Sequence, residues 1–445
     1  MPKKIISLIL IILTICSMSV GVSAYEPSGF SVSAKNAMLI CLEVTPDNDE
    51  IIFEKGADER VYPASITKIM TATLMLESER YNPEAKVAMT EEVLKLISGT
   101  GSSVSNLKVG EEITQLDLLY MVLMSSFGDC TLLAAITYAD SVENFVAKMN
   151  AKAQELGLEN THYENPVGLH HEENYTTPRD TYILTKYALQ NETFKTVCES
   201  HRYTVPATNM SNYTRTLTTT NMLQDNTTNY YYPYAKGVKT GYTDEAGRCL
   251  VSTASYNGYK YMCLVFGCPP NAREHFADSR NLYRWAFNNF KYKQVADSDN
   301  PICEIGVDLS LNTDFVSLYV ENGFRSVLPK DADDSTISIV PHPTDKKVDA
   351  PIKKGQVLGT ADIIYAEQVL GTVNLVSHED VEKSNLLAIL RAVKKFFTSS
   401  YMKIVYALIG IAVLVFIISI IKLNAGRKKS KRKVKYVPYR ENRKH

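Results

Sequence analysis

Two separated parts of the chain carry the short apolar runs that are typical of β-strands. Runs at 38–40 and 51–53 flank a turn of Pro, Asp and Asn residues at 46–49, which predicts a β-hairpin. Strand patterns return at 250–251 and 261–266, and the turn between them contains an Asn-Gly pair. Both ends of this region therefore contribute strands to a sheet.

Between these strands, apolar residues recur three and four positions apart, as they do on one face of a helix. This spacing predicts helices at 66–76, 116–124 and 142–156. Strands, then helices, then strands predict an α+β domain over residues 31–291, an antiparallel sheet with helices on its faces.

The pattern changes after residue 300. From 301 to 378 the apolar segments are short and bounded by turn residues, with clear strand patterns at 316–320 and 336–340. Short strands at regular spacing predict a small all-β domain. We therefore expect two folded domains in succession.

Each end of the chain carries an apolar run of a different kind. Lys3 and Lys4, an apolar run at 5–16 and the small residues at 22–24 predict a secretory signal peptide over residues 1–24. Residues 404–421 are eighteen residues without a charge. A helix of that length spans about 27 Å, which is close to the hydrocarbon thickness of a bilayer.

The segment before this predicted transmembrane helix is amphipathic. Over residues 384–400, leucine, isoleucine, valine and phenylalanine recur at three- and four-residue steps, with Arg391, Lys394 and Lys395 between them. This pattern favours a helix on the membrane surface in contact with lipids. A helix packed on a domain is the alternative.

The distribution of charge predicts on which side of the membrane the folded domains lie. The 445 residues carry a formal charge of −1, yet residues 422–445 alone contain eleven Lys or Arg and one Glu. Positive charge stays on the cytoplasmic side of a membrane, so we expect a single-pass membrane protein with a basic cytoplasmic tail and an acidic extracytoplasmic body. The basic tail fits anionic lipid and not nucleic acid.

The eight cysteines form no recognisable framework. Removal of Cys16 with the signal peptide leaves seven, widely scattered, which we interpret mostly as small buried hydrophobic residues with room for one disulfide. The sequence predicts no metal site and no cofactor. The cluster of two His and two Glu at 170–173 fits no familiar ligand spacing, and we interpret it as a solvated loop.

The first candidate for chemistry is Ser65-Ile66-Thr67-Lys68. Residues three apart share a helical face, so the Ser65 hydroxyl and the Lys68 amine can meet. A serine becomes a good nucleophile when a neighbouring base takes its proton, and burial among apolar residues keeps a lysine neutral. The same S-x-x-K spacing occurs elsewhere, at Ser105/Lys108, Ser400/Lys403, Ser419/Lys422 and Ser430/Lys433. Only the Ser65/Lys68 pair lies in a predicted helix with apolar neighbours in the extracytoplasmic part of the chain.

Two further motifs follow in the chain. Lys239-Thr240-Gly241 and Tyr242 precede a predicted strand, and an extended edge of this composition can lie along a substrate backbone and bind a carboxylate. The adjacent serines Ser125 and Ser126 fall between two predicted helices, where they could equally be a helix cap.

Taken in order, these motifs resemble the S-x-x-K, S-x-N and K-T-G signature of the serine penicillin-recognising enzymes. The closer resemblance is to the low-molecular-mass D-alanyl-D-alanine carboxypeptidases, peptidase family S11. It is carried by the segments at 101–103, 110–112, 117–119, 165–170, 175–177, 237–250 and 350–357. The resemblance implies a serine β-lactamase/DD-peptidase-like fold with a C-terminal β domain and membrane attachment.

The resemblance also implies an acyl-transfer mechanism on peptidoglycan stem peptides. Ser65 would attack the carbonyl of the penultimate D-alanine, with Lys68 as its base, and Ser126 would relay a proton to the leaving amine. β-Lactam antibiotics would acylate the same serine and act as inhibitors.

Four residues of the third motif would bind the substrate. Lys239 and Thr240, next to Gly241, would hold the terminal carboxylate. The backbone N–H groups of Ser65 and Tyr242 would form the oxyanion hole.

One position departs from the family pattern. If Ser126 is the second-motif serine, Gly128 stands where the family has an asparagine that bonds the substrate backbone. Asparagine at 128 would then be expected to raise acylation or leave it unchanged. Ser125 is the alternative second-motif serine. A serine β-lactamase and a degenerate, non-catalytic wall-binding module are the alternative functions.

Overall fold

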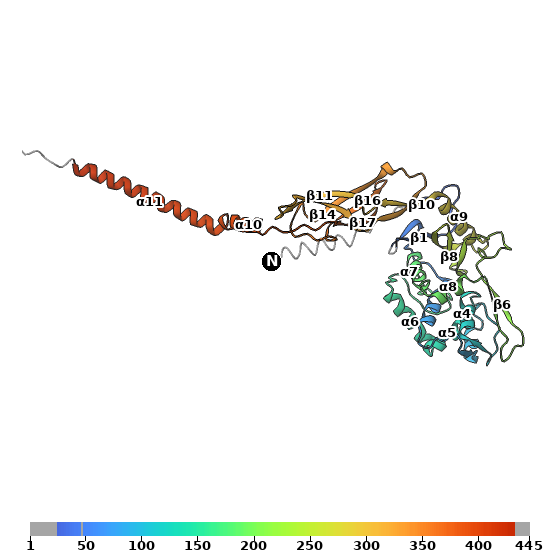
Figure 1. The fold of residues 1–445 in the computed structure, drawn as a ribbon. Helices are drawn as coiled ribbons and strands as arrows, with labels where there is room; N and C mark the ends of the chain where they lie inside the picture. Colours follow the sequence, from blue (N-terminus) through green and yellow to red (C-terminus); the bar gives the residue numbers. More distant parts are fainter. Residues whose placement is uncertain (1–24, 46–47, 432–445) are drawn as a thin grey trace, which may run out of the picture. The chain divides into compact units, whose positions relative to one another are not determined.

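The computed structural model describes residues 25–45 and 48–431 (Figure 1). The predicted signal peptide at 1–24 and the end of the basic tail at 432–445 lie outside the described residues.

The strands predicted at the two ends of the first domain join in one five-stranded sheet of order β2-β1-β9-β8-β7, with all neighbours antiparallel. Its strands are β1 Asn36–Thr45, β2 Asn48–Lys55, β7 Ala235–Thr243, β8 Gly247–Tyr256 and β9 Tyr259–Cys268. The predicted hairpin is confirmed, because Leu39 pairs with Phe53. The Asn257-Gly258 turn joins β8 to β9, and both of its residues have the positive φ that a tight hairpin turn requires.

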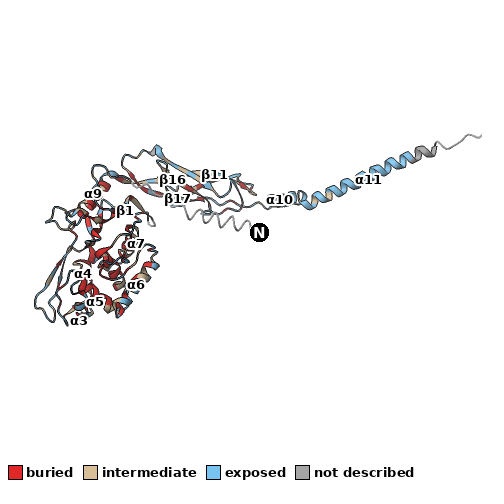
Figure 2. Ribbon diagram, turned by 180° about the vertical axis from the view of Figure 1, so that it is seen from behind, coloured by how far each residue is buried: buried red, intermediate tan, exposed pale blue. Residues whose placement is uncertain are grey.

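Helices cover both faces of this sheet, as the α+β prediction requires. They are η1 Ala64–Thr67, α2 Lys68–Glu77, α3 Glu91–Ile97, α4 Gln115–Leu123, α5 Gly128–Ala139, α6 Val142–Glu155, α7 Pro178–Ala188, α8 Glu192–Glu199 and α9 Glu274–Asn289. Alternate residues of β1 point to opposite faces: Met38 and Ile40 pack in the core with the central helices, whereas Leu39 and Cys41 pack with α9. Buried residues accordingly concentrate in this domain (Figure 2).

Side-chain caps define where several of these helices begin. Thr114 and Asp117 form a capping box at the start of α4, and Thr177 caps α7, whose first residue is Pro178. Two short two-stranded antiparallel sheets lie outside the main sheet: β3 Lys86–Ala88 with β4 Glu112–Thr114, which are separated by α3, and the hairpin of β5 Arg202–Val205 with β6 Arg215–Thr218.

After α9 the described chain is built mainly of strands until residue 377, as predicted. β10 Phe290–Ala296 pairs with β13 Phe324–Pro329. A six-stranded sheet has the order β14-β16-β17-β12-β11-β15. Its strands are β11 Pro301–Asp308, β12 Phe315–Val320, β14 Ile337–Pro343, β15 Lys347–Asp349, β16 Val357–Tyr365 and β17 Gln368–Ser377, with the short helix η2 Asp334–Thr336 before β14.

Two helices end the described chain, α10 Asn385–Phe397 and α11 Ser400–Lys431. No residue of α10 is buried, and its apolar side chains, among them Ile389 at 60% exposure, face outward. The apolar side chains of α10 are thus left uncovered, although Arg391 on the same helix forms ion pairs with Asp308 and Asp349. Residues Ser400–Ala425 of α11 form a helix long and apolar enough to cross a membrane, and its most apolar stretch of eighteen residues has a mean hydropathy of 3.1 and no buried residue. In Figure 2, α11 is mostly exposed over residues 400–425, the part of the helix whose burial is described.

The structure corrects one part of the prediction for the cysteines and confirms the other. All seven in the described residues are free thiols, so the single disulfide for which the sequence left room does not form there. Six are buried and Cys303 is partly buried, which confirms their interpretation as small hydrophobic residues. Burial raises the pKa of the Cys41 thiol to about 12, which keeps this thiol protonated and unreactive at neutral pH.

Candidate active site

Ser65 and Lys68 meet as their spacing predicted. Ser65 lies in the 3₁₀ turn η1 and Lys68 begins α2, which places Lys68 Nζ in a 2.9 Å hydrogen bond with Ser65 Oγ. Ala64, directly before the serine, has a φ of +46°, a backbone conformation that costs a non-glycine residue about 1–3 kcal/mol. Backbone strain next to a reactive group is typical of catalytic sites.

The surroundings of Lys68 favour its neutral form. The side chain is fully buried, and its other hydrogen bond is to a backbone carbonyl, that of Val167, at 2.7 Å. Burial, with a smaller contribution from the positive charge of Lys239, holds the pKa of Lys68 well below its ordinary value. A buried amine with a lowered pKa can accept a proton from the adjacent serine.

The loop at 165–169 lies against the serine turn and orients Lys68. The Asn165 side-chain oxygen accepts hydrogen bonds from the N–H groups of Gly168 and Leu169, which curls the backbone and directs the Val167 carbonyl at Lys68. Gly168 has a φ of +85°, and a Cβ there would overlap the Ala64 carbonyl oxygen. Only glycine lets this loop approach the serine turn so closely.

The third motif lies on β7, one of the two edge strands of the sheet, directly before β8, the strand that the sequence predicted after it. Lys239 is buried and donates to the Thr240 carbonyl oxygen at 2.9 Å, and burial lowers its pKa to about 7. A Cβ on Gly241 would lie 3.1 Å from the Pro63 carbonyl oxygen and 3.2 Å from the Ser65 nitrogen. Glycine therefore lets β7 pack against the serine turn, a role that the sequence did not indicate.

Tyr242 follows on the same strand and is 43% exposed. Its hydroxyl donates to Asp244 at 2.5 Å, and the guanidinium of Arg248, its partner across β7 and β8, lies 4.9 Å from the ring centroid. The contacts with Asp244 and Arg248 fix the orientation of the Tyr242 ring.

Ser125 and Ser126 lie between α4 and α5, in the predicted helix–helix corner. Ser126 has a φ of +62°, so this corner also carries a strained residue. Both serines line the same cavity as Ser65, and the choice between them stays open.

That cavity has a volume of about 770 Å³. Five of the seven predicted site residues line it, namely Ser65, Ser126, Thr240, Gly241 and Tyr242, whereas Lys68 and Lys239 are buried and are not among the lining residues. The structure thus brings the three motifs together, although they lie far apart in the sequence.

The cavity wall also contains residues that the sequence analysis missed. Thr220 bonds the Thr240 hydroxyl at 2.6 Å, and Arg273 adds a positive charge among the lining residues, which also include Asp244 and Glu245. Neither Thr220 nor Arg273 lies in a recognisable motif, so only the fold could place them in the cavity wall.

Gly128 is the first residue of α5, and the structure revises our expectation for it. A Cβ on Gly128 would overlap Ser102 Oγ and lie 2.9 Å from Ile97 Cδ1. A side chain at 128 therefore requires Ser102, in the loop between α3 and β4, and Ile97, at the end of α3, to move. Because of this crowding, we now expect asparagine at 128 alone to lower acylation.

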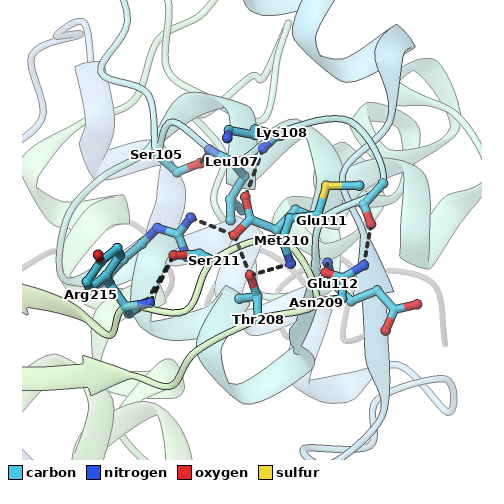
Figure 3. A network of polar contacts seen from close by, with 12 residues as sticks. Ser105, Leu107, Lys108, Glu111, Glu112, Thr208, Asn209, Met210, Ser211 and Arg215 are labelled. Carbon is cyan, nitrogen blue, oxygen red and sulfur yellow. Dashed lines mark hydrogen bonds and ion pairs between the residues drawn. The ribbon is translucent and has the colours of Figure 1, made fainter.

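Arg215 binds a buried carboxylate outside the set of cavity-lining residues. Its Nη2 lies 2.5 Å from Glu111 Oε1, and Glu111 also accepts from the Thr208 hydroxyl and the Lys108 N–H (Figure 3). Burial opposes ionisation of Glu111, but these hydrogen bonds and the Arg215 charge outweigh it and hold its pKa below the ordinary value. The network ties the β5–β6 hairpin to the loop that ends at Glu111.

Within residues 25–45 and 48–431, no group of three or more His, Cys, Asp or Glu side chains is arranged to hold a metal ion. His170 instead packs edge-on against Tyr62 and lies 4.0 Å from Glu245.

Comparison with known proteins agrees with this geometry. A family model described as D-alanyl-D-alanine carboxypeptidase matches residues 22–269, and one described as penicillin-binding protein 5, C-terminal domain, matches residues 290–383. D-alanyl-D-alanine carboxypeptidase DacF of Bacillus subtilis is 28% identical over 397 residues, which cover 87% of this chain and 97% of the relative. DacC of Escherichia coli is 27% identical, with 75% and 82% covered.

Solved structures show the same fold. Penicillin binding protein 5 from Haemophilus influenzae superposes with a TM-score of 0.63 at 25% identity, covering 80% of this chain and all of that one. The Streptomyces K15 DD-transpeptidase superposes with a TM-score of 0.53 at 29% identity, covering 58% and 98%. With its two family matches and this fold, the chain belongs to the D-alanyl-D-alanine carboxypeptidases, peptidase family S11.

Proposed function

We propose that this protein is a serine-type D-Ala-D-Ala carboxypeptidase that removes the terminal D-alanine from peptidoglycan stem pentapeptides. The observation that carries the proposal is the 2.9 Å contact between Ser65 Oγ and the fully buried amine of Lys68, beside a cavity lined by all three motifs. Family membership supports the substrate class.

In the first step, Lys68 Nζ takes the Ser65 hydroxyl proton while Oγ attacks the carbonyl carbon of the penultimate D-alanine. The bond from this carbon to the nitrogen of the terminal D-alanine then breaks, and the nitrogen leaves as an amine after gaining a proton through Ser126. Water next attacks the acyl-enzyme, and Ser65 regains its proton.

Residues of β7 would bind the terminal D-alanine, which is the residue that leaves. Protonated Lys239 and the Thr240 hydroxyl would attract the terminal carboxylate, and the charge of Arg273 on the cavity wall supports an anionic ligand. The N–H groups of Ser65 and Tyr242 would hold the developing oxyanion, since Gly241 brings their strand and turn together.

A β-lactam offers the same serine a strained amide, so we expect penicillins to acylate Ser65 and remain bound. A serine β-lactamase would instead hydrolyse the acyl-enzyme rapidly. A degenerate wall-binding module would bind without reacting. The intact Ser65–Lys68 pair speaks against the degenerate module.

We further propose that α11 anchors the protein in the cell membrane as a single span. The outward apolar side chains of α10 would rest on the lipid surface, with the basic tail cytoplasmic and the catalytic domain extracytoplasmic. Labelling of single cysteines introduced at exposed positions on either side of α11, in intact cells with a membrane-impermeant reagent, tests this orientation. Labelling only on the tail side would contradict it.

The decisive test of activity is digestion of a pentapeptide muropeptide by the full chain in detergent, with mass detection of the products. We expect loss of one D-alanine by the wild type and none by Ser65→Ala. A labelled penicillin should bind covalently to the wild type alone. Fast turnover of penicillin with an intact pentapeptide would favour the β-lactamase, and no reaction with either would favour the degenerate module.

A further inference from the structure

The loop at 100–105 packs against the first turn of α5 at the position where the family motif is broken. The Gly128 N–H donates to the Ser103 carbonyl oxygen at 2.7 Å, so loop and helix are joined through the backbone. Ser102 Oγ occupies the space into which a side chain at 128 would project. The missing side chain of the second motif has therefore been replaced in space by a residue from another segment.

This loop is held by a buried charge. Both carboxylate oxygens of Asp129 accept from the Ser105 N–H at 3.0 Å, and one also accepts from the Ser105 hydroxyl at 2.6 Å. Asp129 is fully buried on α5, and charge-assisted hydrogen bonds of this kind are about twice as strong as neutral ones. Ser102 is thus fixed relative to Gly128 and the second motif.

Ser102 is placed to act on a ligand. It lines the active-site cavity together with Ser65 and Ser126, and it is only partly buried. Among the described residues, its backbone N–H bonds Thr100 Oγ1, while its hydroxyl has no hydrogen-bond partner. A hydroxyl in a cavity wall without a protein partner can donate to or accept from a substrate.

We infer that Ser102 is the substrate-positioning residue that takes over the role of the absent second-motif side chain, through a hydrogen bond from its hydroxyl to the substrate backbone. The inference rests on the proposed function and adds a residue to its binding site. It explains how Gly128 can be part of a working site: the glycine makes room for the loop, and the loop supplies the polar group.

The first test compares Ser102→Ala with Ser98→Ala in the full chain in detergent. Ser98 is exposed at the end of α3 and is not among the residues that line the cavity, so it provides a matched serine truncation. We expect Ser102→Ala to lower the second-order rate of acylation by a fluorescent penicillin about five- to tenfold, as for one lost hydrogen bond. Ser98→Ala should react like the wild type, and both variants should keep the thermal unfolding temperature of the wild type.

The second test is a cycle of Gly128→Asn, Ser102→Gly and the double variant. Gly128→Asn alone should lower acylation because its Cβ overlaps Ser102 Oγ. Ser102→Gly alone should lower acylation because the hydroxyl is lost. The double variant should recover acylation above both single variants, since the amide enters the vacated space, and a purely structural role of Ser102 would not produce this rescue.

The outcomes separate the two proposals. Wild-type labelling with an unchanged rate in Ser102→Ala would overturn the inference and leave the proposed function intact. A folded double variant that acylates no faster than the better of its two parents would also overturn it, and Ser102→Ala provides the test where Ser102→Gly does not fold. A wild type that takes up no penicillin would overturn the proposed function and this inference with it.

Discussion

The hydroxyls of Thr220 and Thr240 are 2.6 Å apart, and this contact joins the third motif to a residue twenty positions upstream. Thr220 follows the end of β6, whereas Thr240 lies on β7. Either hydroxyl can donate to the other, so the Thr240 proton either points at Thr220 or, when Thr220 donates, is left free for a ligand. The orientation of the proposed carboxylate-binding hydroxyl therefore depends on a residue outside the motif.

Thr220→Val should weaken substrate binding without unfolding the protein, because Thr220 is exposed. We expect KM for a D-Ala-D-Ala peptide to rise about two- to tenfold with kcat nearly unchanged, as for the loss of one hydrogen bond. Thr218→Val makes the same change at an exposed position on β6 and should behave as wild type. Equal KM values for Thr220→Val and wild type would show that the contact has no role in binding.

The pH dependence should report both buried lysines. Lys68 must be neutral to accept a proton, and its pKa is held well below the ordinary value, so kcat/KM should rise from acid pH and level off far below pH 10. Lys239 must be charged to attract a carboxylate, and its pKa is about 7, so kcat/KM should fall as the pH rises through this region. Steady-state kinetics between pH 5 and about 10 on a peptide substrate would show both limbs.

Lys239→Arg provides the control for the alkaline limb. Arginine keeps its charge throughout this range, so the fall above pH 7 should disappear, whatever the loss in absolute rate. An alkaline limb at the same pH in this variant would mean that another group is responsible.

The ion pair between Glu111 and Arg215 should contribute to the free energy of unfolding. Glu111→Gln leaves the partly buried guanidinium without its counter-charge, and Arg215→Met leaves a buried carboxylate, so each should lower the free energy of unfolding by about 3 kcal/mol. The double variant should lose clearly less than the sum of the two. Denaturant unfolding of the full chain in detergent measures the cycle, and strict additivity would show that the two groups do not interact.

Glu50 should make stability depend on pH. Burial raises its pKa from 4.5 to about 7, although it accepts hydrogen bonds from the Val327 N–H and the Ser326 hydroxyl. The folded state then binds a proton that the unfolded state has lost, so this contribution to stability is complete below pH 4.5 and is lost as the pH rises through about 7.

Glu50→Gln should remove that part of the pH dependence. The variant should be more stable than wild type at pH 8 and differ little at pH 4.5, as measured by thermal unfolding. Glu43→Gln, at an exposed carboxylate of the neighbouring strand, serves as the control. Identical pH profiles for Glu50→Gln and wild type would contradict the prediction.

Much of the fold could be predicted because its patterns are local. The hairpin of β1 and β2, the helices that begin near Ile66, Gln115 and Val142, and the strands β12 and β14 follow from periodicity and turn residues within a few positions. The Ser65–Lys68 contact could also be predicted, since both residues lie within one helical turn. The order of strands in the sheet could not, because pairing between β1 and β9 joins residues more than two hundred positions apart.

The sequence by itself determined the family, the α+β fold followed by an all-β domain, and the apolar helix near the C-terminus, because motif spacing and hydrophobic period are properties of short segments. Only the tertiary structure decided what lies opposite Gly128, Gly241 and Arg215. The sequence shows that a glycine has no side chain, but it does not show which neighbouring residue leaves no room for one. That neighbour comes from a distant segment. Ser102, the Ser65 turn and Glu111 are those neighbours, and packing alone brings them there.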